Sequence, residues 1–122
     1  MRKNTIIEAS RELTGREKLL FLKTSAAQKI DEITENGPVT VKPVDYALIS
    51  CSSDNEADEN YNKIVIVSDD GQYYTSGSSS FIESFLDIYN AMKDDPEDYL
   101  VEFSRQPSKN RPGKYFLACN IM

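Results

Sequence analysis

The feature that most constrains the fold is a pair of strand-like runs joined by Asp70-Gly71. Residues 63–68 are rich in β-branched side chains, and residues 72–75 carry two tyrosines and a threonine. Both compositions are typical of β-strands. Asp-Gly between two such runs predicts a two-residue hairpin, because a type I′ turn needs positive φ at both central positions.

A two-residue turn also fixes which residues of the hairpin face each other. Tyr73 should lie opposite Ser68, and Tyr74 opposite Val67. Because side chains alternate along a strand, one tyrosine is expected on each face of the sheet.

Further strands are predicted on both sides of this hairpin. Residues 39–51 read as one long strand in which Pro43 marks an edge, a bulge or a bend, since proline cannot donate to a ladder. Residues 99–104 and 115–121 read as two more strands. In the last of these, Phe116 lies on the more polar face, which leaves it either an exposed ring or a core residue.

Two helices are expected. Residues 5–30 read as helical, with a capping box from Thr14 to Glu17, although residues 26–33 could be a short second helix or irregular. A second capping box, from Ser80 to Glu83, opens a helix whose apolar residues recur every three or four positions until Asp94-Asp95-Pro96 ends it.

The order of these elements predicts a mainly β (α+β) fold. Five strands with one helix between the third and fourth is the order of an OB-fold barrel. We expect one domain over residues 1–122, with an N-terminal helical extension over residues 1–36 and an OB-like barrel over residues 38–122.

Charge is unevenly distributed. The formal net charge is −6, yet residues 1–30 carry seven Lys/Arg against three Asp/Glu, and residues 99–122 carry four against one. Residues 31–98 carry three against sixteen. The basic run at residues 104–114 holds four cations and no anion, and on an acidic protein it indicates an anionic ligand.

In an OB-fold the strand 2–3 face and the strand 4–5 loop form the oligonucleotide site. In this chain the tyrosine-bearing hairpin would be strands 2 and 3, and the basic run would be the strand 4–5 loop. The expected phosphate contacts are Arg105, Lys109, Arg111 and Lys114, with Asn110 as a hydrogen-bonding residue. The expected base-stacking residues are Tyr73, Tyr74 and Phe116, with Tyr46 as an addition from the first strand.

The sequence lacks the residues on which several other functions usually depend. The chain has no histidine, no GxxxxGK[ST] and no GxGxxG, so we expect no enzyme, no catalytic or metal site and no cofactor. Cys51 and Cys119 lack a partner at metal-binding spacing and read as buried apolar residues. No apolar run approaches the ~20 residues of a membrane span, and no secretory signal is apparent, which predicts a cytoplasmic protein without membrane contact.

The acidic middle of the chain supports a different hypothesis. Residues 52–60 are expected to be an acidic loop, which would repel phosphate if it lay in the binding face. It lacks the glycine and terminal glutamate of a calcium loop. A small acidic protein that inhibits an enzyme through protein–protein contact, by presenting a DNA-like charged surface, is therefore the alternative.

Three stretches give the chain a family resemblance: residues 9–19 (ASRELTGREKL), residues 74–85 (YTSGSSSFIESF) and residues 107–114 (PSKNRPGK). They resemble small early bacteriophage proteins described as single-stranded DNA-binding proteins. The resemblance implies non-sequence-specific coating of single-stranded DNA in phage replication or recombination, in the cytoplasm of an infected bacterium. It also implies phage or host replication proteins as partners, although the chain ends Cys119-Asn120-Ile121-Met122 and not in an acidic tail.

Overall fold

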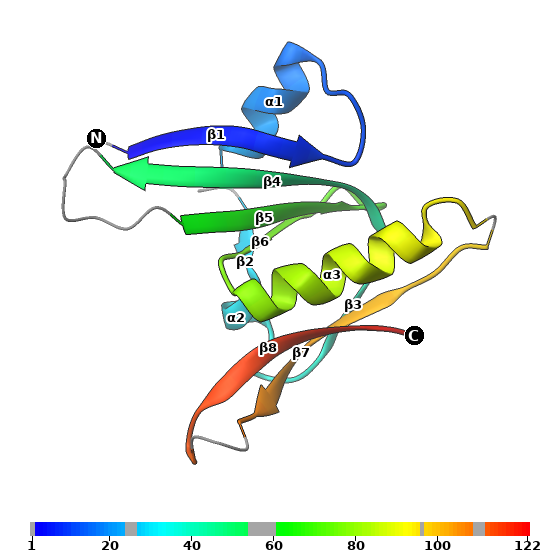
Figure 1. The fold of residues 1–122 in the computed structure, drawn as a ribbon. Helices are drawn as coiled ribbons and strands as arrows, with labels where there is room; N and C mark the ends of the chain where they lie inside the picture. The colour runs from blue at the N-terminus through cyan, green and yellow to red at the C-terminus, as the bar shows by residue number, and fades with distance from the viewer. Residues whose placement is uncertain (1, 24–26, 54–60, 96, 109–111) are drawn as a thin grey trace.

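The computed structural model describes residues 2–23, 27–53, 61–95, 97–108 and 112–122. This part of the chain is mainly β and holds two sheets (Figure 1). The five-stranded sheet has the order β1 (Arg2–Ala9), β4 (Pro43–Ser53), β5 (Tyr61–Ser68), β6 (Tyr73–Ser76), β2 (Gln28–Lys29). The three-stranded sheet has the order β3 (Val39–Val41), β7 (Val101–Pro107), β8 (Tyr115–Ile121). The helices are α1 (Gly15–Leu22), α2 (Ile30–Ile33) and α3 (Ser79–Met92).

The long first strand of the prediction links the two sheets. It divides at Lys42 into β3, which pairs with β7, and β4, which pairs with β5. The ladder shifts register between Pro43 and Asp45, and the Lys42 carbonyl accepts a hydrogen bond from the Asp69 amide at 3.0 Å. Of the three roles left open for Pro43, the structure therefore shows a bend with a bulge. Because proline has no backbone N–H to donate to the ladder, the chain can leave one sheet for the other at this residue.

The N-terminal segment differs from the prediction. Residues 2–9 form a strand that pairs antiparallel with β4, so the expected helix over residues 5–30 and the helical extension over residues 1–36 are wrong there. Pairing with β1 satisfies backbone groups on the edge of β4 that would otherwise stay open. The capping box is confirmed: Thr14 Oγ1 accepts from the Glu17 amide, and the Glu17 side chain accepts from the Thr14 amide.

The β5–β6 hairpin forms, but its turn has three residues instead of two. The Ser68 amide donates to the Gln72 carbonyl and the Gly71 amide to the Ser68 carbonyl, both at 3.0 Å. Only Gly71 has positive φ, at 84°, so the turn is not type I′. The Asp70 carboxylate stabilises it by accepting from the Gln72 amide at 3.1 Å and from the Ser68 hydroxyl.

The extra turn residue changes the register by one position. Tyr73 lies opposite Val67 and Tyr74 opposite Ile66, in contrast to the predicted pairs. The two tyrosines still face opposite sides of the sheet, as expected from the pleat.

Helix α3 begins earlier than predicted and lies beside both sheets, in contact with β5 and β8 (Figure 1). Its N-cap is Ser78, whose hydroxyl accepts from the Phe81 amide at 3.3 Å, and not Ser80. Phe81, Ile82 and Phe85 on its buried face enter the larger core cluster, which lies between the sheets and also contains Tyr46, Ile64, Ile66, Tyr74, Val101, Phe103, Leu117 and Cys119.

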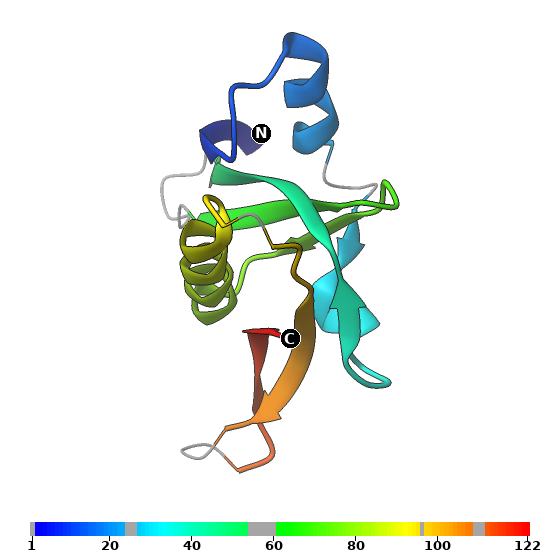
Figure 2. The ribbon, with the colours of Figure 1, turned by 90° about the vertical axis from the view of Figure 1, so that its right-hand side faces the viewer.

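A second, smaller core lies under α1. Leu13 and Phe21 pack there against Ala47, Ile49, Cys51 and Val65. Figure 2 shows α1 and the β7–β8 hairpin at opposite ends of the molecule. The β4–β5–β6 region is therefore covered on both faces, by α3 and the smaller sheet on one side and by α1 on the other.

The described strands do not close into one five-stranded barrel. β6 pairs with β5 and β2, and β8 pairs with β7, so the sheets stay separate between β6 and β8. The two cysteines are free and buried, as the sequence predicts.

Candidate nucleic-acid interface

The basic run begins inside a strand. β7 continues to Pro107, which pairs with Tyr115, and the Ser108 amide donates to the Lys114 carbonyl at 3.0 Å. Arg105 therefore belongs to β7 and not to a loop, whereas Lys114 is exposed at the hairpin end. The predicted contacts Lys109, Asn110 and Arg111 lie outside the described residues.

Arg105 has two partners within the protein. Its Nη2 donates to the Asp31 carbonyl of α2, and its guanidinium carbon lies 4.2 Å from the centroid of the Tyr115 ring. A cation held over an aromatic face gains electrostatic stabilisation from the ring quadrupole.

Two of the predicted stacking residues are in the core. Tyr46 is 4% and Tyr74 8% exposed, so neither can offer a ring face to a base, and that prediction is corrected. Tyr46 packs edge-on against Phe85 and Tyr89, and its hydroxyl donates to Glu8 at 2.8 Å. Burial is the main reason that the pKa of Tyr46 is raised, and the hydrogen bond to Glu8 raises it further. Burial also raises the pKa of Tyr74.

Tyr73 is half-buried on the opposite face of the hairpin from Tyr74. Phe21 of α1 packs edge-to-face against it, with ring centroids 5.9 Å apart. Helix α1 thus occupies the part of the strand 2–3 face where Tyr73 was expected to stack on a base. Phe116, in contrast, is 45% exposed, which decides between the two roles left open for it.

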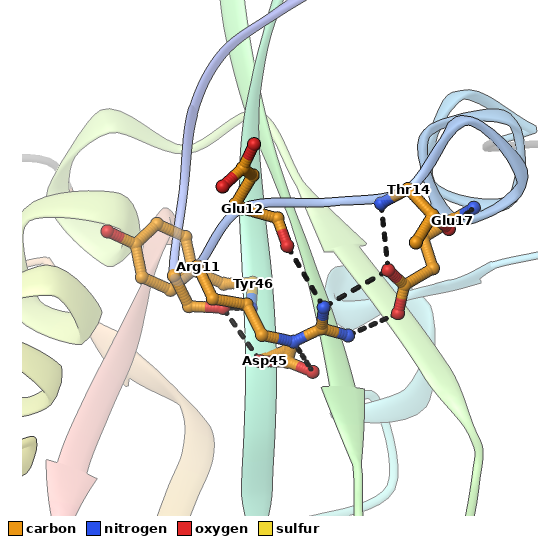
Figure 3. A network of polar contacts seen from close by, with 7 residues as sticks. Arg11, Glu12, Thr14, Glu17, Asp45 and Tyr46 are labelled. Carbon is orange, nitrogen blue, oxygen red and sulfur yellow. Dashed lines mark hydrogen bonds and ion pairs between the residues drawn. The ribbon is translucent and has the colours of Figure 1, made fainter.

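A network of polar contacts fixes α1 in this position (Figure 3). Arg11 donates to Asp45 at 3.2 Å, to the Glu12 carbonyl at 3.1 Å and to both oxygens of Glu17. Asp45 belongs to β4 and Glu17 to α1, so Arg11 ties the helix to the sheet. The Arg11 hydrogen bond lowers the pKa of Glu17 to about 2.

The open end of the hairpin face holds a hollow of about 570 Å³. This volume lies in the range of small-ligand sites. Its walls come from β2, α2, β5, the end of β6 and the start of β8, and its lining residues are Lys29, Asp31, Tyr61, Lys63, Thr75, Ser76, Gly77, Ser78, Tyr115, Phe116 and Leu117. The hollow therefore occupies the place where β6 and β8 stay apart.

Three aromatic rings and two lysines meet at this hollow. Tyr61, Tyr115 and Phe116 are 40–46% exposed, and Lys29 and Lys63 lie among them. One carboxylate, Asp31, is also present in the lining. The arrangement can place a planar apolar group against a ring and an anionic group against an ammonium.

Sequence reasoning identified Phe116 but missed the other lining residues. Tyr61 and Lys63 carried a usable signal, because strand alternation puts them on the face of Val65 and Val67, at the end of β5 away from the turn. Tyr115 follows directly on the basic run. Lys29 had no such signal, since its position depends on the two-residue parallel pairing of β2 with β6.

Comparison with known proteins gives no further guide to function. No family model, curated protein or solved structure matches the chain. Within the described ranges, no three His, Cys, Asp or Glu residues gather into a possible metal site. No helix in that part of the chain has the length and apolar character needed to cross a membrane.

Proposed function

We propose that this chain is a non-catalytic single-stranded DNA-binding protein with an OB-like arrangement of strands. The observation that carries the proposal is the convergence of three exposed rings with Lys29 and Lys63 around one hollow. Single-strand-binding surfaces combine these two residue classes, because the strand offers both phosphates and unpaired base faces.

The strand connectivity supports the OB-like part of the proposal. A bent first strand is shared by two sheets, β5 and β6 form a hairpin, and α3 precedes the β7–β8 hairpin. An OB-fold is a five-stranded, partly open barrel whose strand 2–3 face binds oligonucleotides. The hollow lies at the uncovered end of that face, beside β8.

The proposed binding is tolerant of sequence. Stacking on an aromatic ring contributes about 1–3 kcal/mol per base, and every base has a face to stack. Phosphates would contact Lys29, Lys63 and Lys114, together with Lys109 and Arg111 of the basic run. Coating of DNA during phage replication or recombination is the cellular role that this chemistry fits.

The test is a fluorescence-anisotropy titration with a labelled single strand of about 16 nucleotides, the upper site size of one OB-fold. We expect the logarithm of the affinity to fall by about 0.7 per phosphate contact for each log unit of salt. The same sequence as a duplex should bind more weakly. Equal affinity for both forms, or binding that ignores salt, would contradict the proposal.

A matched pair of variants locates the site. Tyr61→Ala should weaken single-strand binding about 5- to 150-fold, the equivalent of one lost stack. Leu19→Ala removes a side chain that is 63% exposed on α1, away from the hollow, and should leave affinity unchanged. If no oligonucleotide binds and one host protein is captured stoichiometrically instead, the alternative of an acidic inhibitor is favoured.

A further inference from the structure

Arg105 joins two walls of the hollow. Its Nη2 donates to the Asp31 carbonyl on the α2 wall, and its guanidinium lies over the Tyr115 ring on the β8 wall. Asp31 and Tyr115 both line the hollow. One side chain therefore links two of the elements that line the site.

The same contacts leave Arg105 poorly placed to bind phosphate. A two-point contact with phosphate uses two neighbouring N–H groups of the guanidinium. Here Nη2 is occupied by Asp31, and Nε is buried, with no hydrogen-bond partner among the described residues. A phosphate oxygen cannot reach that edge of the guanidinium without breaking the existing arrangement.

The contact also determines how Tyr115 can be used. One face of its ring is covered by the guanidinium, and the side chain as a whole is still 46% exposed. An aromatic ring has two faces, so the opposite face is left for a ligand. A base stacked there would complete a sandwich of base, tyrosine and arginine.

We infer that Arg105 is a positioning residue of the DNA site and not a phosphate contact. It orients Tyr115 for stacking on one face and keeps the α2 wall at a fixed distance from β8. This inference deepens the proposed function and rests on it. It replaces the sequence-based expectation that Arg105 binds phosphate, while Lys114 retains that role.

The experiment measures affinity against salt for four proteins: wild type, Arg105→Met, Arg105→Lys and Lys114→Met. Loss of the cation–ring contact predicts about 2- to 5-fold weaker binding for Arg105→Met, with an unchanged salt slope. Arg105→Lys should not restore affinity, because an ammonium lacks the planar stacking surface. Lys114→Met is the matched control and should lower the slope by about 0.7.

A double-mutant cycle gives a second readout. If Arg105 acts through the ring, Arg105→Met should cause no further loss in a Tyr115→Ala background. A slope reduced by about 0.7, or affinity restored by lysine, would overturn the inference and make Arg105 a phosphate contact. Additive losses would overturn it by showing that Arg105 acts independently of the Tyr115 ring.

A measurement without DNA separates failure of this inference from failure of the proposed function. In the ligand-free protein, the Arg105 side-chain protons should show ring-current shifts that disappear in Tyr115→Leu, and the Tyr115 ring signals should move in Arg105→Met. Absence of these shifts overturns the positioning role even if DNA binds. If the ring-current shifts are present but the protein binds no oligonucleotide, the proposed function is refuted. The contact between Arg105 and Tyr115 is then purely structural, which also overturns the inference.

Discussion

A buried hydroxyl on β6 gives a stability prediction whose sign is unusual. Thr75 is 9% exposed, and its Oγ1 is buried without a hydrogen-bond partner among the described residues. Burying a hydroxyl in this way costs about 1–3 kcal/mol in proteins. Valine has the same branched shape and suits a strand equally well, so Thr75→Val should raise the free energy of unfolding by about 1–2 kcal/mol.

The same substitution at a second buried threonine is the control. Thr34 is 3% exposed, and its hydroxyl donates to the Ile30 carbonyl at 2.7 Å. That carbonyl also accepts from the Thr34 amide at 3.1 Å, so it keeps one partner when the hydroxyl is removed. Thr34→Val should therefore lower the free energy of unfolding by about 0.5–1.5 kcal/mol, the net value of one hydrogen bond.

Urea unfolding followed by circular dichroism measures both changes. The midpoint should rise for Thr75→Val and fall for Thr34→Val, with the slope m unchanged in each, because neither substitution alters the surface exposed on unfolding. In thermal melts the shifts should be about 4 °C per kcal/mol. If both variants are destabilised, the Thr75 hydroxyl has a partner in solution and the reasoning from its burial is wrong.

Three further predictions concern single groups. Gly71→Ala should cost about 1–2 kcal/mol, because φ is 84° there, whereas Gly15→Ala at the start of α1 should not destabilise the protein in urea unfolding. Burial raises the pKa of Cys119 to about 12, so maleimide should label this thiol at pH 7 only at the rate of unfolding, and rapid native labelling would contradict its burial. The Arg11 hydrogen bond lowers the pKa of Glu17 to about 2, so the stabilisation from this pair is present above the ordinary pKa of a glutamate and is lost as pH falls toward 2. An NMR titration should find this midpoint, and Arg11→Gln should raise it toward the ordinary range, with the Thr14 amide still holding the pKa below that of a free glutamate.

Much of the fold follows from local patterns. The β-branched run of β5, the bend at Pro43 and the Thr14 capping box each depend on neighbouring residues, and each is present. The errors arose where a distant partner decided the outcome. Residues 2–9 were expected to be partly helical, but the edge of β4 stabilises them as a strand through backbone pairing.

The hairpin shows the same limit on a smaller scale. Asp70-Gly71 correctly predicted a turn, but a two-residue and a three-residue turn share this sequence signal. The three-residue form has Gly71 alone at positive φ, with the Asp70 carboxylate accepting the Gln72 amide. This choice shifts the register of β6 by one residue, and no local pattern could determine it.

The sequence by itself determined the β5–β6 hairpin, the C-terminal strands and the helix between them, and it showed that aromatic and basic residues gather near the hairpin and the C-terminal strands. The tertiary structure alone decided which rings are available to a ligand. Tyr74 is buried by the core between the sheets, Tyr73 is covered by Phe21 of α1, and Tyr61 and Tyr115 are left exposed. The physical reason is that alternation along a strand assigns a face, whereas exposure of that face depends on elements distant in sequence that pack against it.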